Sequence, residues 1–276
     1  IIRNSVYDAP PVIPSLNTKF ALTKNTDLRL AYARGFRSPS IRELYFNFFD
    51  ANHQIVGNPD LKAETSHSFT GSLNWKKISA KKAVYTATVT GFYNKVENLI
   101  DYAVSASDPN VFILTNVSNS KTAGMNLSTA AKFNNWNISA GASYTGFYND
   151  YSETDKTLPQ LQWSSEANSS VGYSFSKARL DVNLFYKFTG KRPYYTVNSN
   201  QEIVQVQQKG YHMADLTVNK KAFKYFSITA GIRNLFDVKR ITSSLASGGI
   251  HTAGGTRNIA TGRSFFAGLV FNWSKN

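Results

Sequence analysis

Residues Leu180 to Phe188 read LDVNLFYKF, and apolar and polar side chains alternate along them. The side chains that fall on one face are Leu180, Val182, Leu184, Tyr186 and Phe188, and those on the other are Asp181, Asn183, Phe185 and Lys187. Successive side chains of a β-strand point to opposite faces of a sheet. The stretch therefore predicts a strand with one apolar and one polar face.

The same period of two recurs along almost the whole chain, whereas helical periodicity is nearly absent. In 226–233 it predicts an apolar face with Phe226, Ile228 and Ala230, and a polar face with Ser227 and Thr229. About eleven strands are expected, at 15–23, 27–35, 62–76, 82–97, 111–131, 135–149, 159–174, 178–191, 203–220, 223–236 and 261–273. Many are long enough to cross a bilayer at a tilt, which takes about 9–11 residues.

Composition narrows the class of protein. The chain has 276 residues, of which 42% are hydrophobic, and its mean hydropathy is −0.32. It contains no run of about 18 apolar residues, which excludes a membrane-spanning helix but not a transmembrane β-barrel. The absence of cysteine removes disulfides, thiolate metal sites and cysteine nucleophiles.

The connections between the expected strands alternate in length. Short turns fall near 24–25, 77–81, 133–134, 175–177 and 221–222, and the longer connections are 36–61, 98–110, 150–158, 192–202 and 237–260. Outer-membrane barrels have short periplasmic turns and long extracellular loops, whereas a soluble sandwich does not sort its loops in this way. The fold class predicted for residues 1–276 is all-β, a transmembrane antiparallel β-barrel.

The net charge of +14 raises the question of nucleic-acid binding. Many of the Lys and Arg residues lie at or beside the short turns, so we expect a largely solvated charge excess and no nucleic-acid partner. The chain has no G-x-S-x-G, H-E-x-x-H, G-x-x-x-x-G-K-[ST] or G-x-G-x-x-G motif, and its four His are scattered. We therefore expect neither an enzyme nor an intrinsic cofactor.

Three motifs stand in order along the chain: Phe36-Arg37-Ser38-Pro39 with Glu43-Leu44-Tyr45, then Gly57-Asn58-Pro59-Asp60-Leu61-Lys62-Ala63-Glu64, then Gly231-Ile232-Arg233-Asn234-Leu235-Phe236-Asp237. They resemble the "F-R-A-P-x-x-x-E-L-Y", "G-N-P-x-L-x-P-E" and "G-x-x-N-L-F-D" segments of TonB-dependent outer-membrane receptors. Ser38 and Ala63 depart from the family pattern, which has Ala and Pro at these places.

The resemblance implies the C-terminal half of a 22-stranded barrel in the bacterial outer membrane, with its plug and TonB-contacting segment outside this chain. The odd strand count points the same way, since a complete barrel has an even number. It also implies energy-coupled uptake of a scarce, bulky nutrient, with the TonB-ExbB-ExbD complex and the outer-membrane lipid as partners.

For most of the motif residues we expect a structural role at loop edges, the places where a strand meets a loop. Pro39 and Pro59 fix φ and remove a hydrogen-bond donor where a strand meets a long loop, and Asn58 can cap a turn. The residues assigned to such edges are Phe36, Arg37, Pro39, Asn58, Pro59, Leu61, Asn234, Leu235 and Phe236.

For His53 we expect a role in binding the ligand. In haem and haemoglobin receptors of this family, a His between the first two motifs is implicated in taking haem. Here His53 follows the aromatic residues Tyr45, Phe48 and Phe49 in the same loop. Neutral imidazole binds haem iron and aromatic rings stack on porphyrin, so these residues are the predicted ligand site, with His53 as iron ligand. His251 is a second candidate.

The sequence leaves several ligands and two other functions open. Haem, free or from a haem-protein, ranks first, and a ferric siderophore or cobalamin follows. A passive outer-membrane porin and an outer-membrane hydrolase are further readings, which do not account for the three motifs. The Asn-rich and Lys-rich composition suggests a Bacteroidetes source, where a surface lipoprotein is an expected partner.

Overall fold

The computed structural model describes residues 12–49, 54–104, 111–198, 202–223, 225–242 and 256–271. The long strands are β1 (Ser15–Thr23), β2 (Thr26–Arg37), β5 (Glu64–Ile78), β6 (Val84–Val104), β7 (Val111–Phe133), β8 (Trp136–Tyr148), β9 (Leu161–Phe175), β10 (Leu180–Thr189), β13 (Tyr211–Lys221), β14 (Phe226–Arg233) and β17 (Ser264–Phe271). The short elements are α1 (Ile41–Tyr45), β3 (Asn47–Phe49), β4 (Gln54–Val56), the 3-10 helix η1 (Asp150–Glu153), β11 (Arg192–Val197), β12 (Ile203–Gln208), β15 (Arg240–Thr242) and β16 (Thr256–Asn258).

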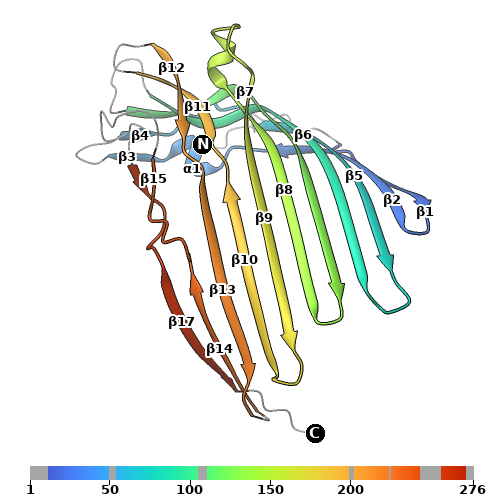
Figure 1. The fold of residues 1–276 in the computed structure, drawn as a ribbon. Coiled ribbons are helices and arrows are strands. Elements are labelled where there is room, and N and C mark those ends of the chain that lie inside the picture. Colours follow the sequence, from blue (N-terminus) through green and yellow to red (C-terminus); the bar gives the residue numbers. More distant parts are fainter. Residues whose placement is uncertain are drawn as a thin grey trace. The chain divides into compact units, whose positions relative to one another are not determined.

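One sheet joins the long strands in the order β1-β2-β5-β6-β7-β8-β9-β10-β13-β14-β17 (Figure 1). Eleven strands therefore follow one another along the described chain, which confirms the expected all-β class and strand number. From β8 to β17 every neighbouring pair is antiparallel. None of the helices in the described ranges is long and apolar enough to cross a membrane.

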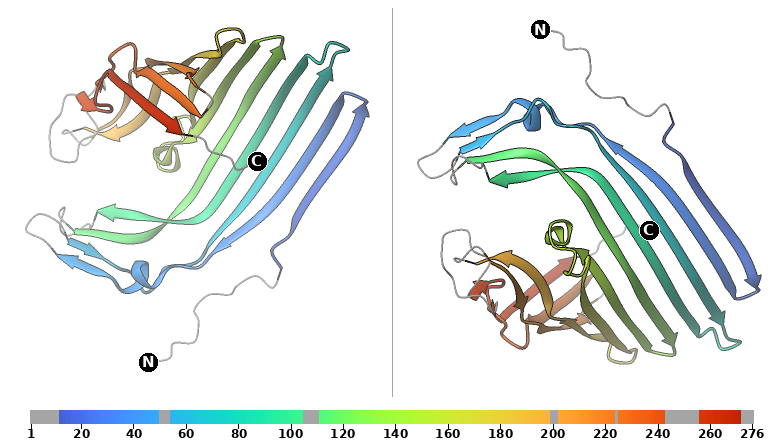
Figure 2. Two further views of the ribbon diagram at one scale, coloured as in Figure 1. Left: turned by 90° about the horizontal axis from the view of Figure 1, so that it is seen from below. Right: turned by 90° about the horizontal axis from the view of Figure 1, so that it is seen from above.

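The chain divides into two compact units. The first comprises residues 1–20, 29–71 and 91–123, and the second comprises 21–28, 72–90 and 124–276. The first unit holds α1, β3 and β4, where β3 pairs antiparallel with β4 and β4 pairs in parallel with β7. The second unit holds the hairpins from β8 onward, whose antiparallel course can be followed in Figure 2.

The register of the second unit sorts its side chains as the alternation predicts. Leu184 lies opposite Leu216 on β13 and Val171 on β9, so apolar residues meet across three strands. Thr229 lies opposite Asn219 and donates to its side-chain oxygen at 2.7 Å. Facing residues of paired strands share one face of a sheet, so an apolar face and a more polar face run through these strands.

Burial is unusual for a chain of this length. The accessible surface is 18843 Å², against about 12,000 Å² for a compact soluble protein of this mass. Large side chains on the apolar face stay exposed, among them Leu184 at 44%, Ile228 at 43% and Leu269 at 66%. An apolar surface of this extent needs a partner or a membrane to cover it.

Some expected boundaries were wrong. The strand expected at 203–220 is broken at Lys209 and Gly210 into β12 and β13. A side chain at 210 would meet the carbonyl oxygen of Thr189 at 2.7 Å, so glycine permits the close passage of two backbones. The expected loop 36–61 contains α1, β3 and β4, and β6 runs on to Val104 into the loop expected at 98–110.

Candidate ligand-binding loop and its polar anchor

The loop after β2 begins with a capped helical turn, α1. Ser40 accepts a hydrogen bond from the backbone N–H of Glu43 at 3.2 Å, and the Glu43 carboxylate accepts one from the backbone N–H of Ser40 at 2.7 Å. This reciprocal capping box satisfies two N–H groups that a helix start leaves unpaired. Pro39, directly before the cap, is buried. The S-x-x-E pattern thus fixes where the turn begins.

The hairpin of β3 and β4 follows α1 at once and returns the chain beside it. Gly57 donates from its N–H to the carbonyl oxygen of Phe46 at 2.9 Å, and Asn58 donates to that of Glu43 at 2.9 Å. A side chain at 57 would lie 2.9 Å from backbone atoms of Leu44 and Tyr45. Only glycine fits there without a shift of the backbone, which gives the first residue of the second motif a packing role.

Aromatic rings gather on this turn and hairpin. Tyr45 is 52% exposed, Phe48 42% and Phe49 64%. The rings of Phe46 and Phe48 stack at 6.4 Å between centroids, and the Arg42 guanidinium lies 4.9 Å from the centre of the Phe46 ring. The three aromatic residues that the sequence assigned to ligand binding are therefore exposed on this turn and hairpin, near Phe46, and their role in binding stays a prediction.

Three charged residues, which we call the outer anchor, hold this loop: Arg37, Glu43 and Glu64. Arg37 donates from Nε and Nη2 to the two carboxylate oxygens of Glu64, both at 2.6 Å. Its Nη1 donates to both oxygens of Glu43, at 3.0 and 2.9 Å. One guanidinium thus joins the end of β2, the helical turn and the start of β5, through the planar fork that carboxylates fit best.

The outer anchor lies outside the membrane-spanning part of the strands. Counted back from Ile78 beside the short turn, the roughly 9–11 residues that cross a bilayer end near Ser68, before Glu64 is reached. Burial raises the pKa of Glu43, but hydrogen bonds from Ser40 and Arg37 outweigh it and lower that pKa below its ordinary value. The hydrogen bonds from Arg37 likewise lower the pKa of Glu64, against a smaller effect of burial.

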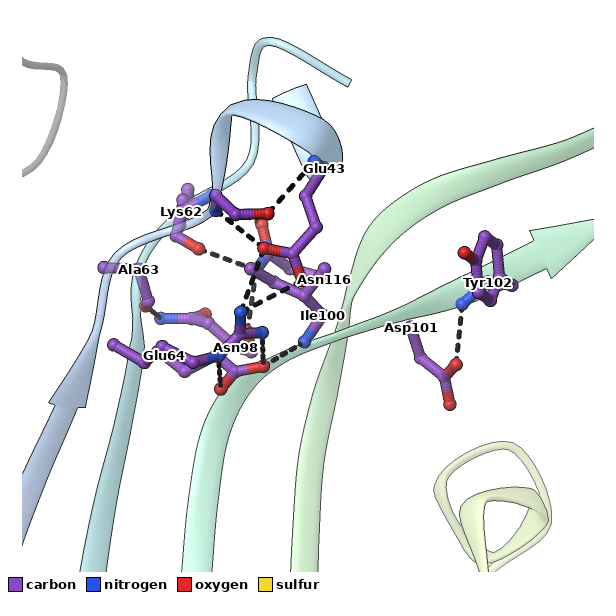
Figure 3. A network of polar contacts seen from close by, with 11 residues as sticks. Glu43, Lys62, Ala63, Glu64, Asn98, Ile100, Asp101, Tyr102 and Asn116 are labelled. Atoms are coloured by element: carbon purple, nitrogen blue, oxygen red, sulfur yellow. Dashed lines mark hydrogen bonds and ion pairs between the residues drawn. The ribbon is translucent and has the colours of Figure 1, made fainter. Parts of the chain in front are cut away.

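Asparagines of neighbouring strands extend the outer anchor (Figure 3). Glu64 also accepts from the backbone N–H of Ile100 at 2.8 Å. The Asn116 amide donates to the carbonyl oxygens of Lys62 and Asn98, at 3.0 and 2.7 Å, and its oxygen accepts from the Lys62 N–H at 2.7 Å. Beside this network, the buried side chains of Leu44, Leu61, Ile100 and Leu114 form an apolar cluster.

The second motif supplies both a turn and part of the apolar cluster. The Asn58 side chain accepts from the N–H of Asp60 at 2.9 Å and donates to the carbonyl oxygen of Leu114 at 3.0 Å. Leu61 is 1% exposed. The sequence reasoning missed Asn98 and Asn116, because nothing in their local sequence marks them: they reach the site only through the pairing of distant strands.

The third motif closes a separate turn, which we call the Asn234 turn (Asn234–Val238). Asn234 is 3% exposed and has φ of 54°. Its amide donates to the carbonyl oxygen of Val238 at 2.7 Å and accepts from the Val238 N–H at 3.0 Å, while its own N–H donates to the Asp215 carboxylate at 2.7 Å. Leu235 donates from its N–H to Ala214, and Phe236 is 56% exposed.

Two predicted ligand residues, His53 and His251, lie outside the residues that the structure describes. Within the described ranges, no group of three His, Cys, Asp or Glu residues is arranged to hold a metal ion. The assignment of His53 as iron ligand therefore stays a prediction. Phe36 lies half-buried near the end of β2, beside Arg37.

The long antiparallel strands, the exposed apolar face and the anchored loop define an outer-membrane β-barrel protein. The family described as TonB dependent receptor-like, beta-barrel, matches residues 4–235. The chain belongs to this family. Its members are outer-membrane receptors and transporters that work with the TonB complex, so the chain lies in the outer membrane.

Individual relatives match this chain over different lengths. Hemoglobin and hemoglobin-haptoglobin-binding protein C of Haemophilus influenzae is 36% identical over 74 residues, which are 27% of this chain and 6% of that protein. The vitamin B12 transporter BtuB of Vibrio vulnificus is 23% identical over 239 residues, 87% of this chain and 34% of that protein. The matched part of the chain thus covers 6% of the first relative's length and about a third of the second's.

Solved structures share the fold. A mutant of the ferric enterobactin receptor PfeA from Pseudomonas aeruginosa, in complex with enterobactin, matches with a TM-score of 0.70 and 21% identity, over 94% of this chain and 40% of that one. The FrpB iron transporter from Neisseria meningitidis matches with a TM-score of 0.68 and 15% identity, over 94% and 39%. These likenesses concern the fold.

Proposed function

We propose that this chain forms part of a receptor that takes up haem, free or from a haem-protein, across the outer membrane with energy from the TonB-ExbB-ExbD complex. The observation that carries the proposal is the group of exposed rings on α1 and β3, held in place by the outer anchor. In the sequence His53 directly precedes β4 and follows Phe49 by four positions. Similarity to hemoglobin-binding proteins over 74 residues supports this ligand.

The chemistry fits a flat, apolar ligand with a metal centre. Tyr45, Phe48 and Phe49 offer ring faces to a porphyrin, which gains from stacking and from removal of apolar surface from water. His53 would supply the axial nitrogen to iron, and His251 is the alternative ligand. The outer anchor holds the helical turn that carries Tyr45 to β2 and β5, which lowers the entropy that ordering this turn on binding would cost. A surface lipoprotein partner stays a prediction.

A ferric siderophore is the second candidate, because several structural neighbours are siderophore receptors, including the ferric enterobactin receptor. The longer alignment with the vitamin B12 transporter keeps cobalamin as a third ligand. Both ligands are also bulky and contain a metal, so the same exposed rings could contact them.

The test is a haemin titration of the intact purified receptor, followed by absorbance in the Soret region. We expect a saturable shift that weakens about tenfold in His53→Ala and at least threefold in Phe49→Ala. His67→Ala is the matched control, since His67 lies on β5 and its Nδ1 is 2.9 Å from the Tyr32 hydroxyl. It should leave the titration unchanged.

The outcomes separate the candidates. A shift that survives His53→Ala overturns His53 as iron ligand and directs the same experiment to His251→Ala. No saturable shift overturns haem, and fluorescence titrations with ferric enterobactin and cobalamin then decide between the other ligands. Uptake that persists in cells without TonB would contradict the receptor and favour a passive porin.

A further inference from the structure

A surface pocket of about 760 Å³ lies at the outer end of the second unit. It is lined by Tyr211, His212, Phe236, Asp237, Val238, Lys239 and Arg240. These residues come from the start of β13, the Asn234 turn and the start of β15. None of the three motifs predicts a ligand for this place.

The pocket adjoins the apolar face of the sheet. His212 lies opposite Phe188 in the register, and Ala214 lies opposite Tyr186, so these side chains share a face with Leu184. Because the polar face of a barrel of this family lines its lumen, the apolar face meets lipid. The pocket is therefore reached from the membrane side of the strands.

The height of the pocket places it near the lipid headgroups. From Leu180, beside the short turn, to Phe188, β10 rises about 27 Å at ~3.4 Å per residue. A strand tilt of about 40° reduces this to about 21 Å along the membrane normal, against an apolar band of about 25 Å. His212 thus lies close to the outer boundary of the apolar band.

The lining of the pocket suits an amphipathic ligand. The Tyr186 hydroxyl is 2.6 Å from Nδ1 of His212, and if the hydroxyl donates, Nε2 carries a proton and is free to act as donor. The Phe188 and His212 rings stack at 4.8 Å, and Tyr186 meets Phe236 edge-on at 6.5 Å. The lower side of the pocket is therefore aromatic.

The upper side of the pocket is cationic. Lys239 pairs with Asp237 at 3.1 Å, and Asp237 also accepts from the backbone N–H of Arg263 at 2.7 Å. Arg240 is exposed and adds a second cation, so the cations of the pocket outnumber its one carboxylate. Guanidinium and ammonium groups above an aromatic surface at a membrane boundary complement an anionic headgroup.

We propose that this pocket binds the phosphate-bearing headgroup of an outer-leaflet lipid. Arg240 and Lys239 contact the phosphate, Nε2 of His212 donates a further hydrogen bond, and the acyl chains follow the apolar face past Tyr186 and Leu184. A soluble anion would gain nothing from the aromatic side of the pocket or from the continuous apolar surface below it. The inference rests on the family and the fold, and holds whichever nutrient the receptor carries.

The test measures lipid that remains bound to the intact receptor after purification from outer membranes in mild detergent, by native mass spectrometry. We expect a phosphate-bearing lipid on the wild-type receptor and about tenfold less of it on Arg240→Glu, as charge reversal at a headgroup contact predicts. His212→Ala, which keeps the cations, should lower the bound fraction about threefold.

Lys177→Glu is the matched control, because it makes the same change of charge in the exposed turn between β9 and β10. Equal loss from Lys177→Glu and Arg240→Glu would overturn the site, as would unchanged binding in Arg240→Glu or a bound lipid without phosphate. If Arg240→Glu lowers the yield of folded barrel, Arg240→Gln decides, since it removes the charge without reversing it.

Discussion

The outer anchor and the Asn234 turn both fix a loop at the end of a strand, but they do so by different means. The outer anchor joins residues 27 and 6 positions apart in sequence through charged side chains that remain partly exposed. The Asn234 turn uses one neutral, buried side chain that bonds to a residue four positions away. One family motif thus ties distant elements together through charged side chains, and another closes its turn through one neutral side chain, with added bonds to Ala214 and Asp215 of β13.

The largest effect is expected from Arg37→Ala. It leaves two carboxylates side by side without a cation, and because Arg37 is 46% exposed, the cost falls below that of a fully buried pair, at about 2–3 kcal/mol. Hydrogen exchange at the amides of Leu44 and Phe46 measures the opening of α1. Arg37→Lys should recover only part of the protection, because an ammonium cannot bridge both carboxylates in plane.

Unchanged exchange at these amides in Arg37→Ala would show that the apolar cluster of Leu44, Leu61, Ile100 and Leu114 holds the loop without the charges. The loop after β2 and the Asn234 turn would then both be fixed by buried groups, and the charges of the outer anchor would make no difference between them.

A smaller and more local effect is expected from Asn234→Ala. The substitution removes both side-chain bonds to Val238 and places Ala, which tolerates the left-handed region less well than Asn, at φ of 54°, for about 2 kcal/mol together. Asn234→Gly loses the same bonds but tolerates this φ, so it should cost about 1 kcal/mol less. Exchange at the Val238 amide should accelerate in both variants.

Protection at Leu44 should stay as in the wild type in both Asn234 variants. If it fell as well, the Asn234 turn would be coupled to the first unit, and the two loops would not be held independently of each other.

The smallest effect is that of mild acid on the outer anchor. The folded-state pKa values of Glu43 and Glu64 lie below their unfolded values near 4.5, so their contribution to stability is complete above that pH. It is lost as the pH falls through the folded values. Exchange at Leu44, corrected for the intrinsic rate, should therefore accelerate as the pH falls below the unfolded value of 4.5.

Val171 on β9 lies opposite Ile138 and Leu184, none of which carries a titratable side chain, so exchange at the Val171 amide serves as the reference in the same samples. Equal acceleration at both amides would point to general acid unfolding and would contradict a specific role of the two carboxylates.

Much of the strand pattern could be predicted, and the reason is visible in individual strands. Leu180 to Phe188 alternate in sequence, and the structure pairs Val182 and Leu184 with apolar or aromatic residues on both β9 and β13. The break at Gly210 could not be predicted, because it arises where the backbone passes Thr189, a contact between distant residues. The sequence marked the aromatic residues of the candidate loop, whose role in binding stays a prediction, but did not show that Arg37 joins Glu43 to Glu64.

The sequence by itself determined the faces of the strands, the length of the connections and the motifs of the family, because alternation, turn residues and capping patterns act over a few residues. Only the tertiary structure decided that Arg37 joins Glu43 to Glu64, that Asn116 joins the neighbouring strands, and that His212 meets Tyr186 beside a cationic pocket. These contacts depend on the register in which the strands pair. A slip of one residue would turn every side chain of a strand to the opposite face, and no local sequence pattern specifies the register.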